Sequence, residues 1–298
     1  YTPDYCAGSF RAEALTKSLK KNKNFKKIII FSTAPQRYGK LENVSRKEID
    51  NNFVLHRFKT PHHKNKFSLQ IFSFIIYALK SFLFAMKYRN DFDVVFATSS
   101  RFGTGFLGYT ISKFFNKKLT LDIRDIFSDS LSSLKVFRFK VFSIIIKLIK
   151  YFEKKICNEA DWLNFVSPGF LEYKHIELNR YRSEIFTNGI DEIFIKNRQN
   201  SFKRNNYNNK LIITYAGNIG FGQGLESTIP SIAKHFKNKI IFRIIGDGSA
   251  KHIIKKELSK INLSNIEIYK PVNREKLIEY YNSSDVLFLQ LNNISAFD

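Results

Sequence analysis

The chain has 298 residues and carries 49 Lys and Arg against 26 Asp and Glu, a formal net charge of +23. A hydrophobic fraction of 44% and a charged fraction of 25% are ordinary for globular proteins, which excludes wholesale disorder and collagen-like or coiled-coil rods. Two cysteines cannot form a disulfide framework for this length, which points to a reducing compartment. The charge predicts an anionic partner (nucleic acid, a membrane surface or a phosphorylated small molecule), unless coding bias supplies lysines that are simply solvated.

The first two thirds of the chain alternate short apolar runs with helical patterns. Strands rich in β-branched and aromatic residues, separated by helices of ten or more residues, are typical of a parallel sheet with helical crossovers. We expect strands at 27–33, 52–58, 93–98, 118–123, 162–166 and 184–187, and helices at 9–19, 67–88, 102–115 and 135–158.

A polar, Asn-rich stretch at 197–209 is the best linker candidate, and the alternation restarts after it. We therefore predict an N-terminal domain over 1–196 and a C-terminal domain over 210–298, both Rossmann-like. In the second domain we expect strands at 211–216, 239–245, 266–269 and 285–291, and helices at 225–236, 250–261 and 274–281.

Two apolar segments raise the question of lipid contact. Phe67–Met86 has about the 20 apolar residues that a membrane span requires, but Lys80 interrupts it and a crossover helix is needed there. We expect a buried crossover helix with a membrane-facing edge. Lys135–Lys155 interleaves seven cations and one acid with large apolar residues. That pattern suits either in-plane binding to an anionic bilayer or a crossover helix whose cations face water.

Glycine-rich loops follow several predicted strands and precede helices. In open α/β sheets, ligands bind beyond the carboxyl ends of strands, where glycine lets a phosphate approach a helix N-terminus. Neither a dinucleotide fingerprint nor a P-loop is present. We interpret the loops as sites for a phosphate-bearing small molecule. The alternative is that a glycine at such a position only permits the backbone conformation of the turn. The candidate residues are Gly8, Arg11, Gly217, Asn218, Gly220, Gln223, Gly224, Gly246, Asp247 and Gly248.

A charged cluster ends the predicted strand 118–123. Asp122, Arg124 and Asp125 are costly in a core and suited to a cleft, so we take them as catalytic candidates. An aspartate there could orient a hydroxyl nucleophile, and Arg124 could bind a phosphate. The alternative is a self-satisfied ion pair with a helix N-cap. The histidines lack metal-ligand spacing, so no metal site is expected.

Taken in order, these motifs resemble the family 4 retaining glycosyltransferases, and a sub-pattern resembles the fucosamine-transferase-like members of bacterial O-antigen and capsule pathways. The resemblance implies an α/β fold of GT-B type, two Rossmann-like parallel-sheet domains facing across a cleft. The motifs that carry it are Pro3, Gly8 and Arg11, Asp122–Asp125, Asn188-Gly189-Ile190-Asp191, Ala216-Gly217-Asn218, Gly220, Gln223-Gly224-Leu225, Gly246-Asp247-Gly248 and Asn282–Val286.

The resemblance also implies a function. A nucleotide-diphosphate sugar would be held mainly by the second domain, and the first would hold an acceptor, often a polyprenyl-diphosphate-linked saccharide at the cytoplasmic face of the membrane. Asn188, Gly189 and Asp191 would lie at the cleft and hinge. No metal or other cofactor is expected, because helix N-termini and cations would stabilise the leaving diphosphate.

The chain departs from the family pattern in two respects. Asn218 and Gln223 stand where the family has a cationic clamp, and the family's paired glutamates would follow Asp298. A first strand is also expected before Tyr1, so we predict that this chain by itself is inactive or unstable, although the full protein is an enzyme. Three alternatives stay open: a sugar-nucleotide 2-epimerase of the same fold, a membrane scaffold with a degenerate fold, and a non-catalytic basic membrane- or nucleic-acid-binding protein. For the last, no nucleic-acid recognition element is recognisable.

Overall fold

The computed structural model divides the chain into two compact units, residues 1–188 (unit 1) and 189–298 (unit 2). Each is described by itself. The structure describes residues 1–4, 7–35, 44–62, 67–99, 102–128, 140–172, 182–196, 209–261 and 263–292.

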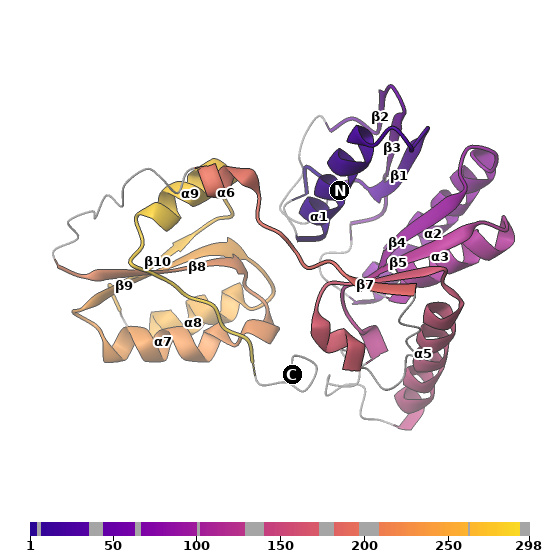
Figure 1. The fold of residues 1–298 in the computed structure, drawn as a ribbon. Helices are drawn as coiled ribbons and strands as arrows, with labels where there is room; N and C mark the ends of the chain where they lie inside the picture. The colour runs from indigo at the N-terminus through magenta and orange to yellow at the C-terminus, as the bar shows by residue number, and fades with distance from the viewer. Residues whose placement is uncertain are drawn as a thin grey trace. The chain divides into compact units, whose positions relative to one another are not determined.

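Unit 1 opens with a helix and a three-stranded sheet of order β1-β3-β2 (Figure 1). Strands β1 and β3 are parallel, as predicted, but β2 is antiparallel to β3 and was missed. The four residues of β2 are exposed and three of them are charged, so the strand has no apolar signal, and the hairpin turns at Asn51 with φ 47°. The elements are α1 (Ala7–Lys21), β1 (Ile28–Thr33), β2 (Lys47–Asp50) and β3 (Phe53–Phe58).

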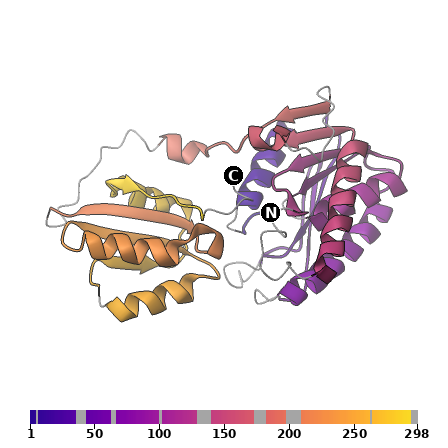
Figure 2. The ribbon, with the colours of Figure 1, turned by 90° about the horizontal axis from the view of Figure 1, so that it is seen from below.

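A second sheet in unit 1, of order β4-β5-β6-β7, is parallel throughout. Its core is built from the apolar residues of β5 and β6, among which Leu119, Leu121 and Phe165 are at most 1% exposed. Three helices lie side by side along this unit (Figures 1 and 2). The elements are α2 (Phe67–Lys87), β4 (Val94–Ser99), α3 (Phe102–Phe114), β5 (Lys118–Ile123), α5 (Lys140–Glu159), β6 (Trp162–Phe165), η2 (Pro168–Glu172) and β7 (Ser183–Ile185). Residues 135–139 of the predicted basic helix lie outside the described residues.

Unit 2 contains a four-stranded parallel sheet of order β10-β9-β8-β11, with α7 and α8 on one face and α6 and α9 on the other (Figure 1). Buried Phe242 and Ile244 of β9 pack against Leu225 and Ile229 of α7 in one hydrophobic cluster. The elements are α6 (Glu192–Lys196), β8 (Leu211–Asn218), η5 (Phe221–Gln223), α7 (Leu225–His235), β9 (Ile240–Asp247), α8 (Lys251–Ile261), β10 (Ile266–Tyr269), α9 (Arg274–Asn282) and β11 (Val286–Leu287).

Two boundaries differ from those expected. Helix α6 packs on α9, with the rings of Phe194 and Tyr281 6.2 Å apart, so residues 189–196 belong to unit 2 and not to the first domain. The predicted strand 285–291 pairs only over Val286–Leu287. Most of the predicted linker, 197–208, lies outside the described residues.

Candidate functional site

The carboxyl end of β5 holds a buried ion pair between two residues that are 111 positions apart. Arg11, one turn into α1, donates from Nε to Asp122 Oδ2 at 2.9 Å and from Nη2 to Oδ1 at 2.8 Å. Its guanidinium also donates to the backbone oxygens of Phe186 at 2.9 Å and Thr187 at 3.3 Å, and to Asn188 Oδ1 at 3.1 Å. Five hydrogen bonds are as many as a guanidinium can donate.

Asp122 sits in the middle of a polar row across the sheet. Thr98, Asp122 and Asn164 occupy one register position on β4, β5 and β6. Thr98 Oγ1 donates to Asp122 Oδ2 at 3.3 Å, and Asn164 Nδ2 donates to Oδ1. Asn164 Oδ1 in turn accepts from the backbone N–H of Phe186 at 3.0 Å. Sequence reasoning missed Thr98 and Asn164, although a polar residue near the end of each neighbouring strand was a signal that could have found them.

This geometry bears on two predicted roles. Asp122 is 1% exposed and its carboxylate is engaged by three protein side chains, so in this structure it serves as an ion-pair partner. All five N–H donors of the Arg11 guanidinium bind protein acceptors, so none is left for a phosphate in this arrangement. The self-satisfied ion pair considered as the alternative is therefore present, but its cation is Arg11 and not the neighbouring Arg124.

Arg124 differs from Arg11 in that its side chain has no hydrogen-bond or ion-pair partner among the described residues. Its buried Nε has no hydrogen-bond acceptor among the residues that the structure describes. Its Nη1 lies against Gly8, close enough that a Cβ added there would be 2.6 Å away. Gly8 belongs to the first turn of α1, which contains no acid. An unpaired guanidinium beside a helix N-terminus is an arrangement that attracts an anion.

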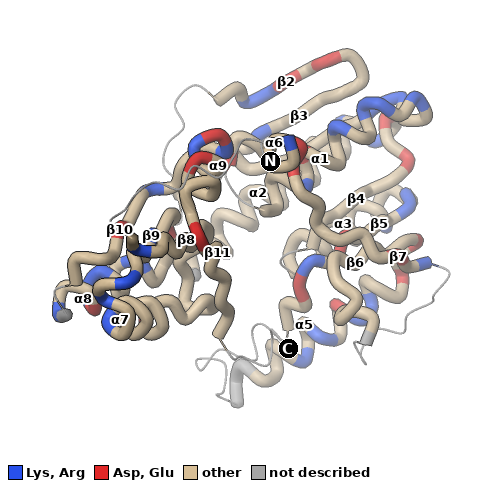
Figure 3. Tube along the Cα trace, turned by 60° about the vertical axis from the view of Figure 1, so that its left-hand side comes forward, with Lys and Arg blue, Asp and Glu red and all other residues tan. Residues whose placement is uncertain are grey.

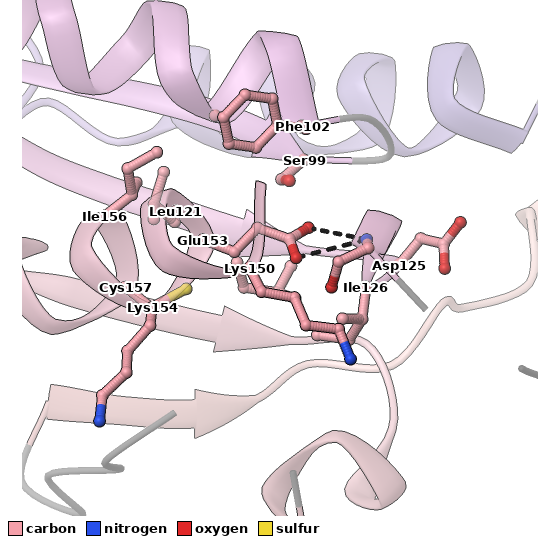
Figure 4. A pocket seen from close by; sticks show the side chains of 13 residues that line it. Ser99, Phe102, Leu121, Asp125, Ile126, Lys150, Glu153, Lys154, Ile156 and Cys157 are labelled. Atoms are coloured by element: carbon pink, nitrogen blue, oxygen red, sulfur yellow. Dashed lines mark hydrogen bonds between the residues drawn. The ribbon is translucent and has the colours of Figure 1, made fainter. Parts of the chain in front are cut away.

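Asp125 lines a small pocket between β5, α3 and α5 (Figure 4). Glu153 of α5 occupies one side of it and accepts from the backbone N–H groups of Phe127 at 3.0 Å and Ser128 at 3.3 Å, while the Asp125 carboxylate points away from Glu153 (Figure 4). The pocket has a volume of about 30 Å³, which is room for one or two waters. It is too small for a sugar.

The same pocket contains Cys157, whose thiol is inert by its surroundings. Burial first, and the nearby Glu153 carboxylate second, raise its pKa from 9.0 to about 12. We expect Cys157 to resist iodoacetamide at pH 8 in the folded protein and to react with it in urea. Peptide mass spectrometry measures this, because it separates Cys157 from Cys6, which lies outside the described residues. The thiol ionises at a lower pH in the unfolded chain than in the folded protein. Burial of the neutral thiol therefore contributes its full stabilisation below pH 9, and this stabilisation is lost as the pH rises from 9 to about 12. Rapid labelling of folded Cys157 would contradict this.

In unit 2, the glycine-rich ends of β8 and β9 lie side by side, with Gly217 opposite Gly246 and Asn218 opposite Asp247. Gly246 has φ 150°, and a Cβ there would lie 1.9 Å from the Gly217 carbonyl oxygen, so this position requires glycine. Asp247 accepts from the backbone N–H of Gly248 at 2.8 Å. The structure thus brings these predicted residues together at the carboxyl edge of one sheet.

The loop after β8 is held by its own polar side chains. Gln223 Oε1 accepts from the backbone N–H of Gly220 at 3.0 Å and from Asn218 Nδ2 at 3.3 Å. Gly224 ends the loop in the left-handed region, φ 61°, as the N-cap of α7. The two residues that stand at the family's cationic positions therefore stabilise the loop. A cation that sequence reasoning missed, Lys251 of α8, donates to the Gly246 carbonyl at 2.7 Å.

The predicted hinge motif straddles the boundary between the units. Asn188, the last residue of unit 1, is bonded by Arg11, whereas Asp191 of unit 2 pairs with Arg274 of α9 at 3.0 Å. Between them, Gly189 has no atom within 4 Å of an added Cβ, and Ile190 is 67% exposed. Each side of the boundary is therefore fixed to its own unit by an arginine.

A second hollow in unit 1, of about 330 Å³, borders β2, β3 and α2. Five of its eight lining residues are cations. Burial first, and then the charges of Lys47 and Lys87, lower the pKa of His56 in its wall. The lining residues are Arg46, Lys47, His56, Arg57, Phe58, Lys59, Lys80 and Phe84. Among the described residues, no group of three or more His, Cys, Asp or Glu is placed to hold a metal ion.

Comparisons with known proteins agree with this architecture. Residues 196–293 match the family described as "Glycosyl transferases group 1". A stretch of 61 residues, 20% of this chain, is 38% identical to an Escherichia coli (strain K12) protein named "Putative colanic acid biosynthesis glycosyl transferase WcaI", of which it covers 15%.

Solved structures show the fold at low identity. A trehalose-6-phosphate synthase is 12% identical with a TM-score of 0.63, and the likeness covers 98% of this chain and 77% of that one. Anabaena Alr3699/HepE, solved with UDP and glucose, is 11% identical with a TM-score of 0.53 over 81% of this chain and 62% of that one. The predicted fold class is confirmed: parallel α/β sheets of Rossmann type, as in GT-B glycosyltransferases. The chain spans less than two thirds of HepE and matches a small part of WcaI.

Proposed function

We propose that this chain belongs to a glycosyltransferase that moves a sugar from a nucleotide-diphosphate sugar to a saccharide acceptor. The observation that carries the proposal is the match of residues 196–293 to the group 1 glycosyl transferases. In that part of the chain, two glycine-rich strand ends lie next to each other, and one leads through the short helix η5 to the N-terminus of α7. Such an edge supports binding of a diphosphate, because backbone N–H groups and the helix dipole face it.

The finer features of the proposal rest on the sequence resemblance. We place the enzyme among the family 4 transferases that act with retention of configuration, without a metal or other cofactor. Its acceptor would be a polyprenyl-diphosphate-linked saccharide of O-antigen, lipopolysaccharide or capsule synthesis. The enzyme would then work as a peripheral protein at the cytoplasmic face of the membrane. The excess of positive charge supports this, since residues 1–200 carry 35 Lys and Arg against 18 Asp and Glu.

Within unit 1 we assign to Arg124 the task of holding a phosphate of one of the substrates. Among the described residues its guanidinium has no acceptor, whereas that of Arg11 donates five hydrogen bonds to the protein. In this assignment Arg11, Asp122 and Asn164 are positioning residues that hold α1 and the end of β5 in place beside it. For Asp125, in the same loop, we keep the catalytic role predicted from the sequence, that of orienting a hydroxyl nucleophile.

Replacing Arg124 with Gln is expected to weaken pyrophosphate binding by about tenfold to a hundredfold, because a charge-assisted hydrogen bond is worth roughly 1.5–3 kcal/mol. Isothermal titration calorimetry measures this, with Arg274→Gln as the matched control, since Arg274 pairs with Asp191 in unit 2. The unfolding temperature of Arg124→Gln should stay near that of the wild type, because no side-chain hydrogen bond to a described residue is lost. Unchanged pyrophosphate affinity would remove Arg124 from the site.

The function itself is tested by radiolabelled transfer. The full-length protein is incubated with a panel of nucleotide sugars, UDP-glucose among them, and with a lipid-linked acceptor extract. Label that moves into the organic phase supports the proposal. Absence of transfer with every donor, together with tight and salt-sensitive DNA binding, would overturn it. Interconversion of the nucleotide sugar without transfer would identify a 2-epimerase.

A further inference from the structure

Helix α2 presents a large apolar face to solvent. Its exposed apolar residues are between 47% and 61% accessible. At 3.6 residues per turn, they fall within an arc of about 120°. Monomeric soluble proteins rarely expose a contiguous apolar face of this extent without a partner. The residues are Ile71, Phe72, Ile75, Leu79 and Leu83.

The opposite face of α2 packs against β1 and β3. Tyr77 donates to the backbone oxygen of Phe31 in β1 at 3.1 Å, and the ring of Phe84 lies 4.9 Å from that of Phe58 in β3. Among the helices that the structure describes, Ser68–Lys87 is the one long and apolar enough to span, and only 17% of that window is buried, so it is less buried than the crossover helix expected from the sequence. A helix with one face packed against the protein and one apolar face exposed to solvent suits in-plane contact with lipid.

Helix α5 carries a second stripe of the same kind. Ile144, Leu148 and Tyr151 are 62%, 54% and 59% exposed and follow one another at helical spacing. Lys147 and Lys154 are exposed along one flank of this stripe, and the lysines of α5 are visible in Figure 3. The basic amphipathic pattern seen in the sequence is thus present as a solvent-facing stripe.

Helix α3 joins the two stripes into one surface. The rings of Phe82 on α2 and Phe114 on α3 lie 5.1 Å apart, and those of Phe106 on α3 and Phe152 on α5 lie 5.6 Å apart. Phe114 itself is 65% exposed. The three helices lie side by side (Figures 1 and 2), and these ring contacts connect α2 to α3 and α3 to α5.

The charge of this face selects an anionic partner. The three helices contain eight lysines and two glutamates. Both glutamates are used inside the protein: Glu153 caps backbone N–H groups after β5, and Glu159 binds Lys113 at 2.8 Å and Tyr109 at 2.9 Å. On the far flank of α2, the basic hollow adds Arg46, Lys47 and Lys59. Apolar side chains rimmed by cations suit an anionic bilayer better than a protein partner.

We propose that the outer face of α2, α3 and α5 is the surface by which unit 1 lies on an anionic lipid bilayer, with the apolar side chains of α2 and α5 inserted and their lysines at the headgroups. The inference gives a docking face to the membrane-bound glycosyltransferase proposed above and rests on that proposal only for its biological purpose. Membrane binding itself follows from the surface, whatever reaction the protein catalyses.

The test is flotation of the 298-residue chain with vesicles of phosphatidylethanolamine and phosphatidylglycerol, compared with phosphatidylcholine alone. We expect binding to the anionic vesicles that weakens with salt. Leu79→Asp should lower the partition coefficient by about tenfold or more, because a leucine that inserts into the lipid is exchanged for a charge. Ile49→Asp on β2 is the matched control, since Ile49 is 63% and Leu79 61% exposed. Lys147→Glu should weaken binding to anionic vesicles only.

Each result decides between lipid and another occupant. Equal vesicle binding of Leu79→Asp and the wild type would overturn the proposal. Retention of the protein in membranes after an alkaline carbonate wash would also overturn it, because that would indicate a membrane span. A dimer that Leu79→Asp dissociates, with no vesicle binding, would assign the face to self-association. Pyrophosphate binding in the same variants separates this from the proposed function: loss of vesicle binding with pyrophosphate affinity retained concerns the docking face alone.

Discussion

Replacing Arg11 with Met is expected to lower the free energy of unfolding of unit 1 by about 3–5 kcal/mol, because breaking a buried ion pair from one side leaves an uncompensated charge. The side chains of Arg11 and Asp122 are 18% and 2% exposed. Removing the guanidinium strips Asp122 of two hydrogen bonds and also frees the backbone oxygens of Phe186 and Thr187. The loss should therefore loosen α1 and the segment that leads to the unit boundary together.

Urea unfolding followed by tryptophan fluorescence measures this effect, since the single tryptophan, Trp162, lies on β6 of unit 1. The control is Lys17→Met on the same helix, whose side chain is 68% exposed and pairs with Glu13. Its loss should cost at most about 0.5 kcal/mol. A second variant, Arg11→Met with Asp122→Leu, should recover part of the stability because no unpaired charge remains. Equal effects of Arg11→Met and Lys17→Met would show that the pair is not structurally important.

The second large effect concerns unit 2. Gly246→Ala is expected to cost about 2–4 kcal/mol, since a side chain at φ 150° is strained and its Cβ would overlap the Gly217 carbonyl oxygen at 1.9 Å. The contact is with backbone and not with a flexible side chain, so relief requires β8 and β9 to separate where they are paired. The glycine-rich edge that we assign to the nucleotide sugar would be distorted at the same time.

Hydrogen exchange of peptides from β9, read by mass spectrometry, localises this effect to unit 2. Protection over Ile240–Asp247 should fall in Gly246→Ala and stay unchanged in unit 1. Gly189→Ala is the matched control, because an added Cβ there meets nothing within 4 Å, and it should change stability by less than about 0.5 kcal/mol. Native protection of β9 in Gly246→Ala would mean that the strand ends adapt without loss.

Much of the fold could be predicted because its signals are local. The apolar runs that became β1, β5 and β9 are buried strands with helices between them, and alternation of this kind leaves few topologies other than a parallel sheet. Strand β2 was missed because its exposed Lys-Glu-Ile-Asp sequence has neither apolar alternation nor β-branched enrichment and is held by pairing with β3. The strand expected over 285–291 was too long because apolar character does not by itself supply a ladder partner.

The candidate site also has features that the sequence could locate and contacts that it could not. The sequence located the charged end of β5 and the glycine-rich ends of β8 and β9, because residue type and position after a strand are local facts. It could not assign partners. Asp122 bonds Arg11 across 111 residues and Asn164 across 42, and such pairs depend on register and on where α1 lies, not on spacing along the chain. The roles of Arg11 and Arg124 were therefore distinguished only by their contacts.

By itself, the sequence determined the order of most strands and helices, the glycine-bearing loops and a charge of +23 that calls for an anionic partner. Only the tertiary structure decided that Arg11 donates its hydrogen bonds to the protein, whereas Arg124 has no side-chain hydrogen-bond partner among the described residues. It also decided which side of α2 is bound to the sheet and which is bare. The physical reason is that propensity and periodicity act over a few residues, whereas burial and hydrogen bonding are settled by neighbours that only folding brings together.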